Sequence, residues 1–283
     1  MTQILKGNLV VETMNQTMIE EVADLKSKGV VPTLAILRIG EKPDDLAYEQ
    51  GIIKRCETVG VTIKKILLPD NVTQEVVMAA IQDINKDDGI HGCMIFRPLP
   101  AHLDEQTLCD ALIPDKDVDG ITRGSMVGVF MDEPWGFPPC TAQACMKILD
   151  YYGVELTGQK AVVIGRSHVI GKPVAMMLLK ENATITICHS RSKDLPQIVK
   201  EADIVIAAVG RTRMIDENFF SPNQIVIDVG INFTEDGEMC GDVDSRNIDG
   251  KVKAYTPVPG GVGTVTTSVL VSNVVKASQS YLK

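Results

Sequence analysis

Two hydrophobic periods alternate along the first half of the chain. The runs Val31–Gly40, Thr62–Asp70 and Gly92–Pro100 are short and largely apolar, and glycine, proline or polar residues bound them, which predicts strands. The segments between them, Asp44–Gly60 and Thr73–Asn85, have helical spacing. Strands and helices in strict alternation indicate a parallel sheet covered by helices.

The second half repeats this alternation more regularly. Its predicted strands are Lys160–Ile164, Thr184–Cys188, Asp203–Val209 and Gln224–Val229, and its predicted helices are Ala142–Tyr152, Lys172–Asn182, Lys193–Glu201 and about Val265–Tyr281. This order is typical of a doubly wound, Rossmann-type unit that binds a dinucleotide. We expect Thr141 to N-cap the first of these helices.

The segment Met131–Cys140 is rich in proline and aromatic residues, and we interpret it as a crossing between domains. A chain of 283 residues is long enough for two domains of roughly 100–200 residues each. We therefore expect an α/β protein with domains at 1–140 and 141–264. The last helix, 265–283, is expected to return to the first domain.

Composition limits the possible partners and the compartment. The net charge is −9, with no run of Lys and Arg, so nucleic acid and anionic membranes are excluded as partners. The N-terminus does not resemble a signal peptide, and no apolar run approaches the length of a membrane span. Seven scattered cysteines without a C-x-x-C pair indicate reduced thiols. We expect a cytoplasmic protein.

A glycine-rich turn follows the first strand of the second half. Gly165, Arg166 and Ser167 come directly after that strand, and Gly171 precedes the next helix. Such a turn brings backbone N–H groups and a helix N-terminus close to a phosphate. The spacing departs from G-x-G-x-x-G, so on this motif alone an ordinary turn with a surface arginine fits equally well.

The end of the following strand favours the phosphate-binding turn over the ordinary turn. His189, Ser190 and Arg191 stand where an NAD site usually has an acid for the ribose hydroxyl. Guanidinium groups and serine donors suit a 2′-phosphate, so we expect NADP in preference to NAD. A solvated loop arginine at Arg191 remains the alternative.

Further glycines stand at strand ends, which is the edge where open α/β sheets bind ligands. Gly210 follows the third of these strands, Gly230 and Ile231 follow the fourth, and a glycine-rich turn spans Pro257–Gly263. Together with the turn at Gly165, these make four turns in register, which predict one cofactor site.

Several long motifs resemble the methylenetetrahydrofolate dehydrogenase/methenyltetrahydrofolate cyclohydrolase family of one-carbon metabolism. They include KDVDG (116–120), PCT (139–141), AVVIGRSHVIGKP (161–173), CHSRS (188–192), IDVGIN (227–232), GDVD (241–244) and TPVPGGVG (256–263). The resemblance runs from Val31 to the C-terminal helix. It implies a homodimer, a tetrahydrofolate substrate bound between the domains, and a nicotinamide cofactor, usually NADP, on the second domain.

The resemblance also assigns roles to individual residues. Tyr48 corresponds to the tyrosine that packs on the pterin, and Asp119 to the acid that hydrogen-bonds it. The positions expected on the folate side are Tyr48, Phe96, Pro98, Leu99, Pro100, Asp119, Pro259, Gly260 and Gly261. The positions expected at the cofactor are Gly165, Arg166, Ser167, His189, Ser190, Arg191, Gly210, Gly230, Ile231 and Thr266. No metal is expected.

Among the positions that depart from the family pattern, two bear on the hydrolysis step. Ile52 stands where the family has a lysine, one helical turn after the tyrosine, and Phe96 stands where it has a glutamine. Hydride transfer needs no proton acceptor, whereas hydrolysis of the methenyl product needs acid–base help worth roughly 10²–10⁴-fold. We therefore expect a dehydrogenase whose cyclohydrolase activity is weak or absent.

Three alternatives remain open. One is the bifunctional enzyme, with Lys54 or Arg97 replacing the lost groups. A second, of another class, is a non-catalytic folate- or nucleotide-binding paralogue. A third is a dehydrogenase acting on another pterin-like one-carbon carrier.

Overall fold

The computed structural model describes residues 2–282, which form two compact units. One contains residues 13–140 and 267–282 and has a three-stranded sheet; we call it the three-strand unit. The other contains residues 2–12 and 141–266 and has a six-stranded sheet; we call it the six-strand unit.

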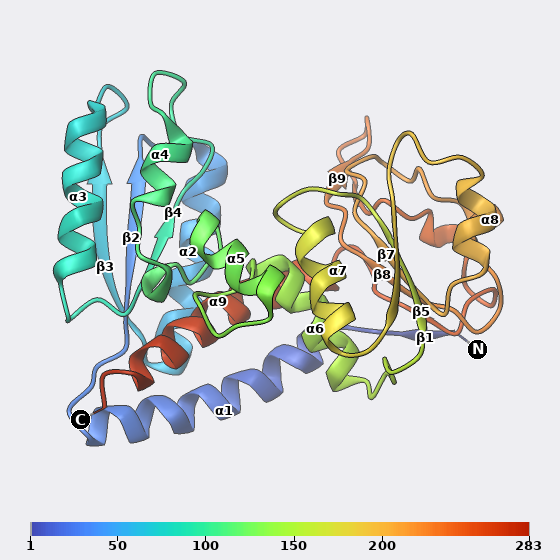
Figure 1. The fold of residues 1–283 in the computed structure, drawn as a ribbon, viewed down its shortest axis with the longest axis horizontal. Coiled ribbons are helices and arrows are strands. Elements are labelled where there is room, and N and C mark those ends of the chain that lie inside the picture. The colour runs from blue at the N-terminus through green and yellow to red at the C-terminus, as the bar shows by residue number, and fades with distance from the viewer. Residues whose placement is uncertain (1, 283) are drawn as a thin grey trace. The chain divides into compact units, whose positions relative to one another are not determined.

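The sheet of the three-strand unit is parallel, with strand order β3-β2-β4 (Figure 1). Its strands are β2 (Thr33–Ile39), β3 (Thr62–Leu68) and β4 (Gly92–Ile95). Its helical segments are α2 (Pro43–Val59), α3 (Gln74–Lys86), α4 (Glu105–Asp110), the 3-10 turn η1 (Pro114–Lys116) and α5 (Arg123–Met131), together with the parts of α1 (Gly7–Ser27) and α9 (Val262–Gln279) that belong to this unit.

The central position of β2 explains its composition. All seven of its residues are buried, as expected for a parallel strand covered on both faces, whereas the edge strand β3 is mostly exposed or half-buried. Leu37 and Ile39 of β2 pack in a core cluster with Ile81 of α3 and Ile95 of β4. This packing fixes the strand ends that carry the loops of the site.

The six-strand unit has strand order β1-β11-β8-β7-β5-β6, with every neighbouring pair parallel. Its strands are β1 (Gln3–Ile4), β5 (Lys160–Ile164), β6 (Thr184–Cys188), β7 (Ile204–Ala207), β8 (Ile225–Asp228) and β11 (Ala254–Tyr255). Helices α7 (Gly171–Lys180) and α8 (Leu195–Lys200) lie on opposite sides of this sheet (Figure 1). That is the doubly wound arrangement expected from the sequence.

Three smaller pieces complete this unit. Helix α6 (Cys140–Tyr151) enters it from the other unit, and β9 (Asn232–Phe233) pairs antiparallel with β10 (Met239–Cys240). The 3-10 turns η2 (Glu217–Phe219) and η3 (Ser245–Asn247) lie in its loops.

The structure confirms the two-domain α/β class and the return of the C-terminal helix, and it corrects several details. Residues 2–12 lie in the six-strand unit rather than in the first domain, because β1 pairs with β11. Thr141 does not N-cap α6, since that helix already begins at Cys140. Helix α1 and the short helices α4 and α5 were not predicted from the sequence, because their apolar patterns are weak.

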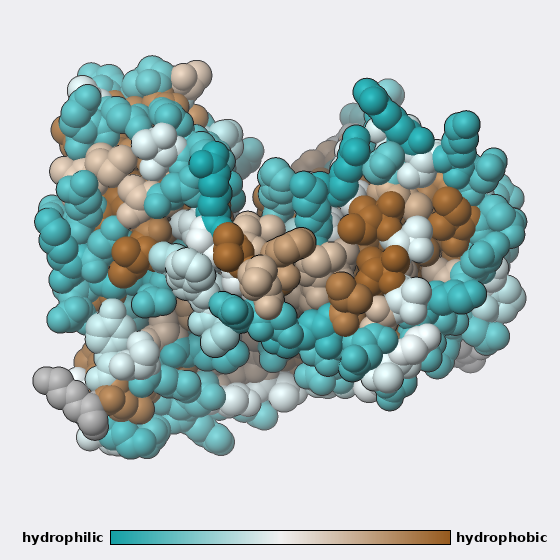
Figure 2. All heavy atoms as spheres, in the orientation of Figure 1, coloured by the Kyte–Doolittle hydropathy of each residue, from teal (hydrophilic) through white to brown (hydrophobic). Residues whose placement is uncertain are grey.

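One face of the molecule is largely polar. On the face drawn in Figure 2, hydrophilic residues supply most of the exposed atoms, and hydrophobic residues form smaller patches among them. Within residues 2–282, no helix combines the length and the apolar character that crossing a membrane requires.

Candidate active site and cofactor site

A cavity of about 350 Å³ opens at the carboxyl ends of β5, β6 and β7 in the six-strand unit. Five of its lining residues are predicted cofactor contacts: Gly165, Arg166, Ser167, His189 and Ser190. The structure therefore brings together two predicted loops that stand more than 20 positions apart in the sequence. The carboxyl edge of a parallel sheet is the expected ligand position in this architecture.

Gly165 is the residue that lets the chain pass tightly over the sheet. Its φ of 140° is accessible to glycine, and an added Cβ would collide with the Ala208 carbonyl. The Ser167 hydroxyl accepts a hydrogen bond from the N–H of Ile170 at 3.2 Å, just before α7 begins at Gly171. Residues 165–167 of the turn thus line the cavity, and α7 begins directly against Gly165, an arrangement that suits a phosphate.

The second loop is also internally bonded. The His189 N–H donates to the Ser192 hydroxyl at 2.9 Å, and the Arg191 N–H donates to His189 Nδ1 at 3.2 Å. Arg191 itself is exposed and does not line the cavity. Arg211, which the sequence analysis did not single out, does line it. The two arginines at the cavity are therefore Arg166 and Arg211, not Arg166 and Arg191.

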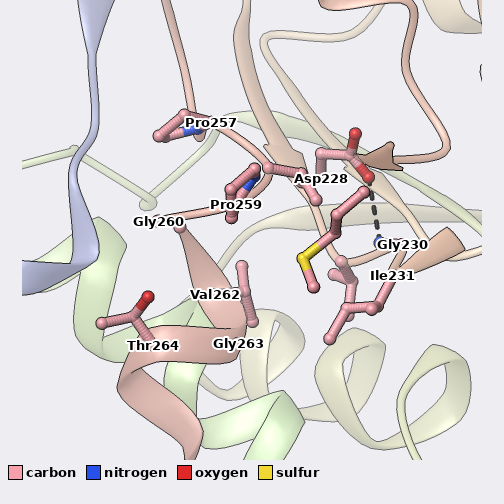
Figure 3. Close-up of a pocket in the computed structure, with 13 residues that line it drawn as sticks. Asp228, Gly230, Ile231, Pro257, Pro259, Gly260, Val262, Gly263 and Thr264 are labelled. Atoms are coloured by element: carbon pink, nitrogen blue, oxygen red, sulfur yellow. Dashed lines mark hydrogen bonds between the residues drawn. The ribbon is translucent and has the colours of Figure 1, made fainter. Parts of the chain in front are cut away.

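A second cavity, of about 240 Å³, lies in the same unit and is lined by residues 228–231, 257–264 and Met239 (Figure 3). It brings Gly230 and Ile231, predicted at the cofactor, next to Pro259, Gly260 and Gly261, predicted on the folate side. Gly210 and Thr266 line neither cavity. The Thr266 hydroxyl instead donates to the Val262 carbonyl within α9, at 3.2 Å.

In the three-strand unit, Tyr48 on α2 meets Phe96, which directly follows β4. Their rings make an edge-on contact with centroids 5.9 Å apart. Burial, the nearby Asp119 carboxylate and Cys140 raise the pKa of Tyr48, and a hydrogen bond with Thr267 partly offsets them. Tyr48 therefore remains a neutral phenol next to Asp119.

Asp119 has a displaced pKa. Desolvation raises the pKa of its carboxyl to about 6, with Arg97 opposing this shift and Asp117 adding to it. The carboxyl also makes a side-chain hydrogen bond with Cys140. The thiol of Cys140 contacts the Val118 carbonyl at 3.2 Å. An acid that titrates near neutral pH inside a ligand site can change its hydrogen-bonding character with pH.

The two departures that bear on hydrolysis are both buried apolar side chains. Ile52 is fully buried, and Phe96 is 4% exposed. Lys54, one of the possible substitutes, is exposed. Arg97, the other, has a buried Nε–H with no hydrogen-bond partner, and its Nη1 lies 3.9 Å from Glu105. Of these two side chains, Arg97 is the one placed to act on the Asp119 carboxyl.

The loop after Phe96 is tied to α4 by a hydrogen bond. The Arg97–Pro98 peptide is cis, and the Leu99 N–H donates to Glu105 at 2.8 Å. The Leu99 side chain packs in the core cluster of this unit rather than facing a ligand, whereas Pro98 is exposed and Pro100 half-buried. Leu99 therefore anchors the loop to the hydrophobic core.

A buried ion cluster holds the helix that carries Tyr48. Glu49, the next residue along α2, pairs with Arg38 of β2 and Lys65 of β3, each at 2.7 Å. Hydrogen bonds from Lys65 and Arg38 outweigh the desolvation that acts in the other direction, so the pKa of Glu49 lies below its usual range. These ion pairs hold α2 against strands β2 and β3.

Family models match both parts of the chain. The model for the tetrahydrofolate dehydrogenase/cyclohydrolase catalytic domain matches residues 5–119, and the model for the NAD(P)-binding domain of the same family matches residues 139–282. Relatives include "Bifunctional protein FolD 1" of Desulfitobacterium hafniense, 51% identical over 99% of this chain and 100% of the relative. "Bifunctional protein FolD" of Carboxydothermus hydrogenoformans is 49% identical over 99% of this chain and 98% of the relative.

Solved structures agree with these matches. The bifunctional enzyme FolD from Campylobacter jejuni superposes with a TM-score of 0.96 at 35% identity, covering 100% of both chains. The Trypanosoma brucei FolD, complexed with NADP cofactor and an inhibitor, superposes with a TM-score of 0.90 at 31% identity, covering 100% of this chain and 99% of that one. With its fold and both family models in agreement, this chain belongs to the tetrahydrofolate dehydrogenase/cyclohydrolase family.

Proposed function

We propose that the protein oxidises 5,10-methylenetetrahydrofolate to 5,10-methenyltetrahydrofolate and passes the hydride to NADP⁺. The observation that supports this most directly is the cavity at the ends of β5, β6 and β7. It combines the glycine turn at Gly165 with the cations Arg166 and Arg211 in a chain that matches the family over nearly its whole length. A binding protein that had lost catalysis would gain nothing from keeping a complete cofactor cavity.

The chemistry of this oxidation fits the side chains present. The hydride leaves the one-carbon bridge between two nitrogens, and the product is a cation that those nitrogens stabilise. No side chain needs to remove a proton, so orientation supplies most of the catalysis. In the proposal, Tyr48 packs on the pterin and Asp119 hydrogen-bonds it, while the six-strand unit holds the nicotinamide cofactor.

NADP is the proposed cofactor in preference to NAD. Two of the loops that line the cavity contribute serine hydroxyls, from Ser167 and Ser190, and Arg166 and Arg211 also line it. Neither loop carries an acid among the lining residues, where a carboxylate would bind the ribose hydroxyls of NAD and repel a 2′-phosphate. Guanidinium groups and hydroxyl donors recognise a phosphate well.

Hydrolysis of the methenyl product is the second candidate activity. The names of the curated relatives favour its presence, since "Bifunctional protein FolD 1" is 51% identical to this chain. The side chains favour a slow reaction, because Ile52 and Phe96 can neither titrate nor donate a hydrogen bond. We therefore propose that oxidation is faster than hydrolysis, so that the methenyl product accumulates.

We also propose a homodimer, as the family resemblance implies. The β9–β10 hairpin and its approach expose three large apolar side chains, Ile231, Phe233 and Met239, at 59%, 61% and 37%. An apolar group of this kind is typical of a surface that pairs with another chain. Size-exclusion chromatography with light scattering tests this proposal. A mass of twice the chain supports the dimer, and the mass of a single chain contradicts it.

A direct assay tests the proposed oxidation. The protein is mixed with 5,10-methylenetetrahydrofolate and either NADP⁺ or NAD⁺, and formation of the reduced cofactor is followed. Turnover that needs both the folate and the cofactor, and that is faster with NADP⁺, supports the proposal. Tight binding of both without turnover would instead support the non-catalytic paralogue.

A further inference from the structure

The motif GDVD at positions 241–244 has no assigned role so far, yet its first aspartate is among the most heavily hydrogen-bonded side chains of the six-strand unit. The Asp242 carboxylate accepts from three successive backbone N–H groups: Val209 at 2.6 Å, Gly210 at 3.0 Å and Arg211 at 2.9 Å. A fourth bond comes from the Asn232 side-chain amide, at 2.9 Å. Asp242 is fully buried.

Three successive N–H groups that point at one spot form an anion-binding nest. Gly210, the middle residue, has a φ of 64°, the left-handed conformation that turns consecutive N–H groups to the same side. In this protein the nest receives an internal carboxylate. Because Val209 and Arg211 on either side line the cofactor cavity, the carboxylate holds one wall of that cavity.

A second buried carboxylate holds Asp242 in turn. Asp228, at the end of β8, accepts from the N–H of Gly230 at 2.9 Å, of Asp242 at 3.0 Å and of Val243 at 2.9 Å. Asp228 also lines the second cavity, where its bond to Gly230 is visible in Figure 3. The two carboxylates therefore connect the loop after β7, the loop after β8 and the GDVD segment.

Two glycines show how closely the loops pack around these carboxylates. A Cβ at Gly230 would collide with the Asp242 side chain, and a Cβ at Gly241 would collide with the Asp228 side chain. Gly230 and Gly241 do not have a positive φ, so the requirement for glycine at both positions is one of space. Each carboxylate is seated against the loop of the other.

From this geometry we infer that Asp242 is a positioning residue for the cofactor, which acts by filling the backbone nest at 209–211 and so holding Arg211 at the cavity, with Asp228 supporting it. The inference rests on the proposed binding of NADP in that cavity. Asp242 does not line the cavity, so its effect is transmitted through the loop.

The central variant is Asp242→Asn, which keeps the size of the side chain. It replaces one acceptor oxygen by an amide group, whose N–H donors would face the backbone N–H donors of residues 209–211. Asp244→Asn is the matched control: Asp244 belongs to the same motif and accepts from Arg246 at 2.8 Å, and it does not bond the 209–211 loop. We expect the Kd for NADP⁺ to rise at least tenfold in Asp242→Asn. The expected change in Asp244→Asn is less than twofold.

Two further readouts separate positioning from simple destabilisation. Hydrogen exchange at the amides of residues 209–211 should accelerate in Asp242→Asn and stay unchanged in Asp244→Asn. If the nest acts through Arg211, then Arg211→Gln alone raises the Kd for NADP⁺. In the double variant with Asp242→Asn, the fold-increase in Kd should be smaller than the product of the two single fold-increases. If Asp242→Asn does not fold, Asp228→Asn, which disturbs the nest indirectly, should show a smaller loss in the same direction.

The outcomes also distinguish this inference from the proposed function. A wild-type protein that binds no NADP(H) would overturn both. A wild type that binds, alongside a folded Asp242→Asn variant with unchanged Kd and unchanged exchange at 209–211, would overturn the positioning role alone. A double variant whose fold-increase in Kd equals the product of the two single fold-increases would show that Asp242 does not act through Arg211. That result also contradicts the inference.

Discussion

The rings of Tyr48 and Phe96 meet edge-on, at 65° and with centroids 5.9 Å apart. The family resemblance assigns the first position to a pterin contact and the second to a glutamine that takes part in hydrolysis. An aromatic ring at Phe96 therefore supports the tyrosine by packing against it, and supplies no polar group. Ile52, fully buried on the same helix as Tyr48, makes a second replacement of this kind.

The double variant Ile52→Lys with Phe96→Gln should gain hydrolysis. A lysine at position 52 would be largely desolvated, which lowers its pKa toward the range useful for acid–base catalysis. We expect hydrolysis of the methenyl product to increase at least tenfold, and by no more than the roughly 10⁴-fold that is the upper limit of such catalysis. The rate of methenyl loss, corrected for spontaneous hydrolysis, measures the effect.

Two single variants serve as controls for that experiment. Lys54 is exposed, so Lys54→Met should leave hydrolysis unchanged. Arg97→Gln tests whether Arg97 has replaced the lost groups. A large loss of hydrolysis in either single variant would mean that the wild type already has a substitute catalyst.

Asp119 gives the reaction a predictable dependence on pH. Its pKa is raised to about 6, mainly by desolvation, and the groups facing it are Arg97, Asp117, Cys140 and Tyr48. The anionic carboxylate is the form that accepts hydrogen bonds from pterin N–H groups. We expect the KM for the folate to rise as pH falls below about 6, while the Kd for NADP⁺ changes little.

The same shift has a consequence for stability. Because the folded pKa of Asp119 lies above its ordinary value of 3.8, its contribution to folding is fully present below that value. It is lost as pH rises through about 6. Asp119→Asn should remove both pH dependences, and persistence of the KM trend in this variant would show that another group titrates.

Cofactor selectivity should depend on the arginines at the cavity. Arg166→Gln removes a cation from the glycine turn, so we expect the KM for NADP⁺ to rise at least tenfold, with a much smaller change for NAD⁺. Arg191→Gln is the matched control, since Arg191 is exposed and lies outside the cavity lining. If Arg191→Gln reduced NADP⁺ affinity as strongly as Arg166→Gln, the assignment of the phosphate contacts would be wrong.

Lys116 should be important for the stability of the three-strand unit. Its side chain is 1% exposed and its ammonium donates to three carbonyls at the end of α3, those of Ile84, Asn85 and Asp87. Lys116→Met would remove these three bonds and leave backbone donors only at the Ile84 and Asp87 carbonyls, which costs about 1–3 kcal/mol. Urea unfolding measures this cost. The control Lys86→Met, at an exposed residue of α3, should change stability by less than about 0.5 kcal/mol.

Much of this fold is predictable from the sequence because its strands are short apolar runs with clear ends. The bounds predicted for β5 and β6 agree with the structure to the residue. Strand β1 was not predictable in this way: it has two residues, and only its pairing with β11, some 250 positions away, makes it a strand. The same long-range pairing moved residues 2–12 from the expected domain.

The site shows the same limit. Spacing predicted two of the loops that line the cavity at the ends of β5, β6 and β7, but it could not decide which side chains line it. Arg191 is not among the lining residues, whereas Arg211, in a different loop, lines the cavity. Asp242 is in a motif visible in the sequence, yet its four donors come from two other loops. Such contacts depend on tertiary structure.

The ratio of methenyltetrahydrofolate accumulated to NADPH formed is the most direct test of the proposed function. It is measured in single progress curves under conditions where spontaneous hydrolysis is slow. With Ile52 and Phe96 in place of the usual polar pair, we predict a ratio close to one throughout the reaction. A ratio near zero, with 10-formyltetrahydrofolate formed as fast as NADPH, would contradict the account and establish the bifunctional enzyme.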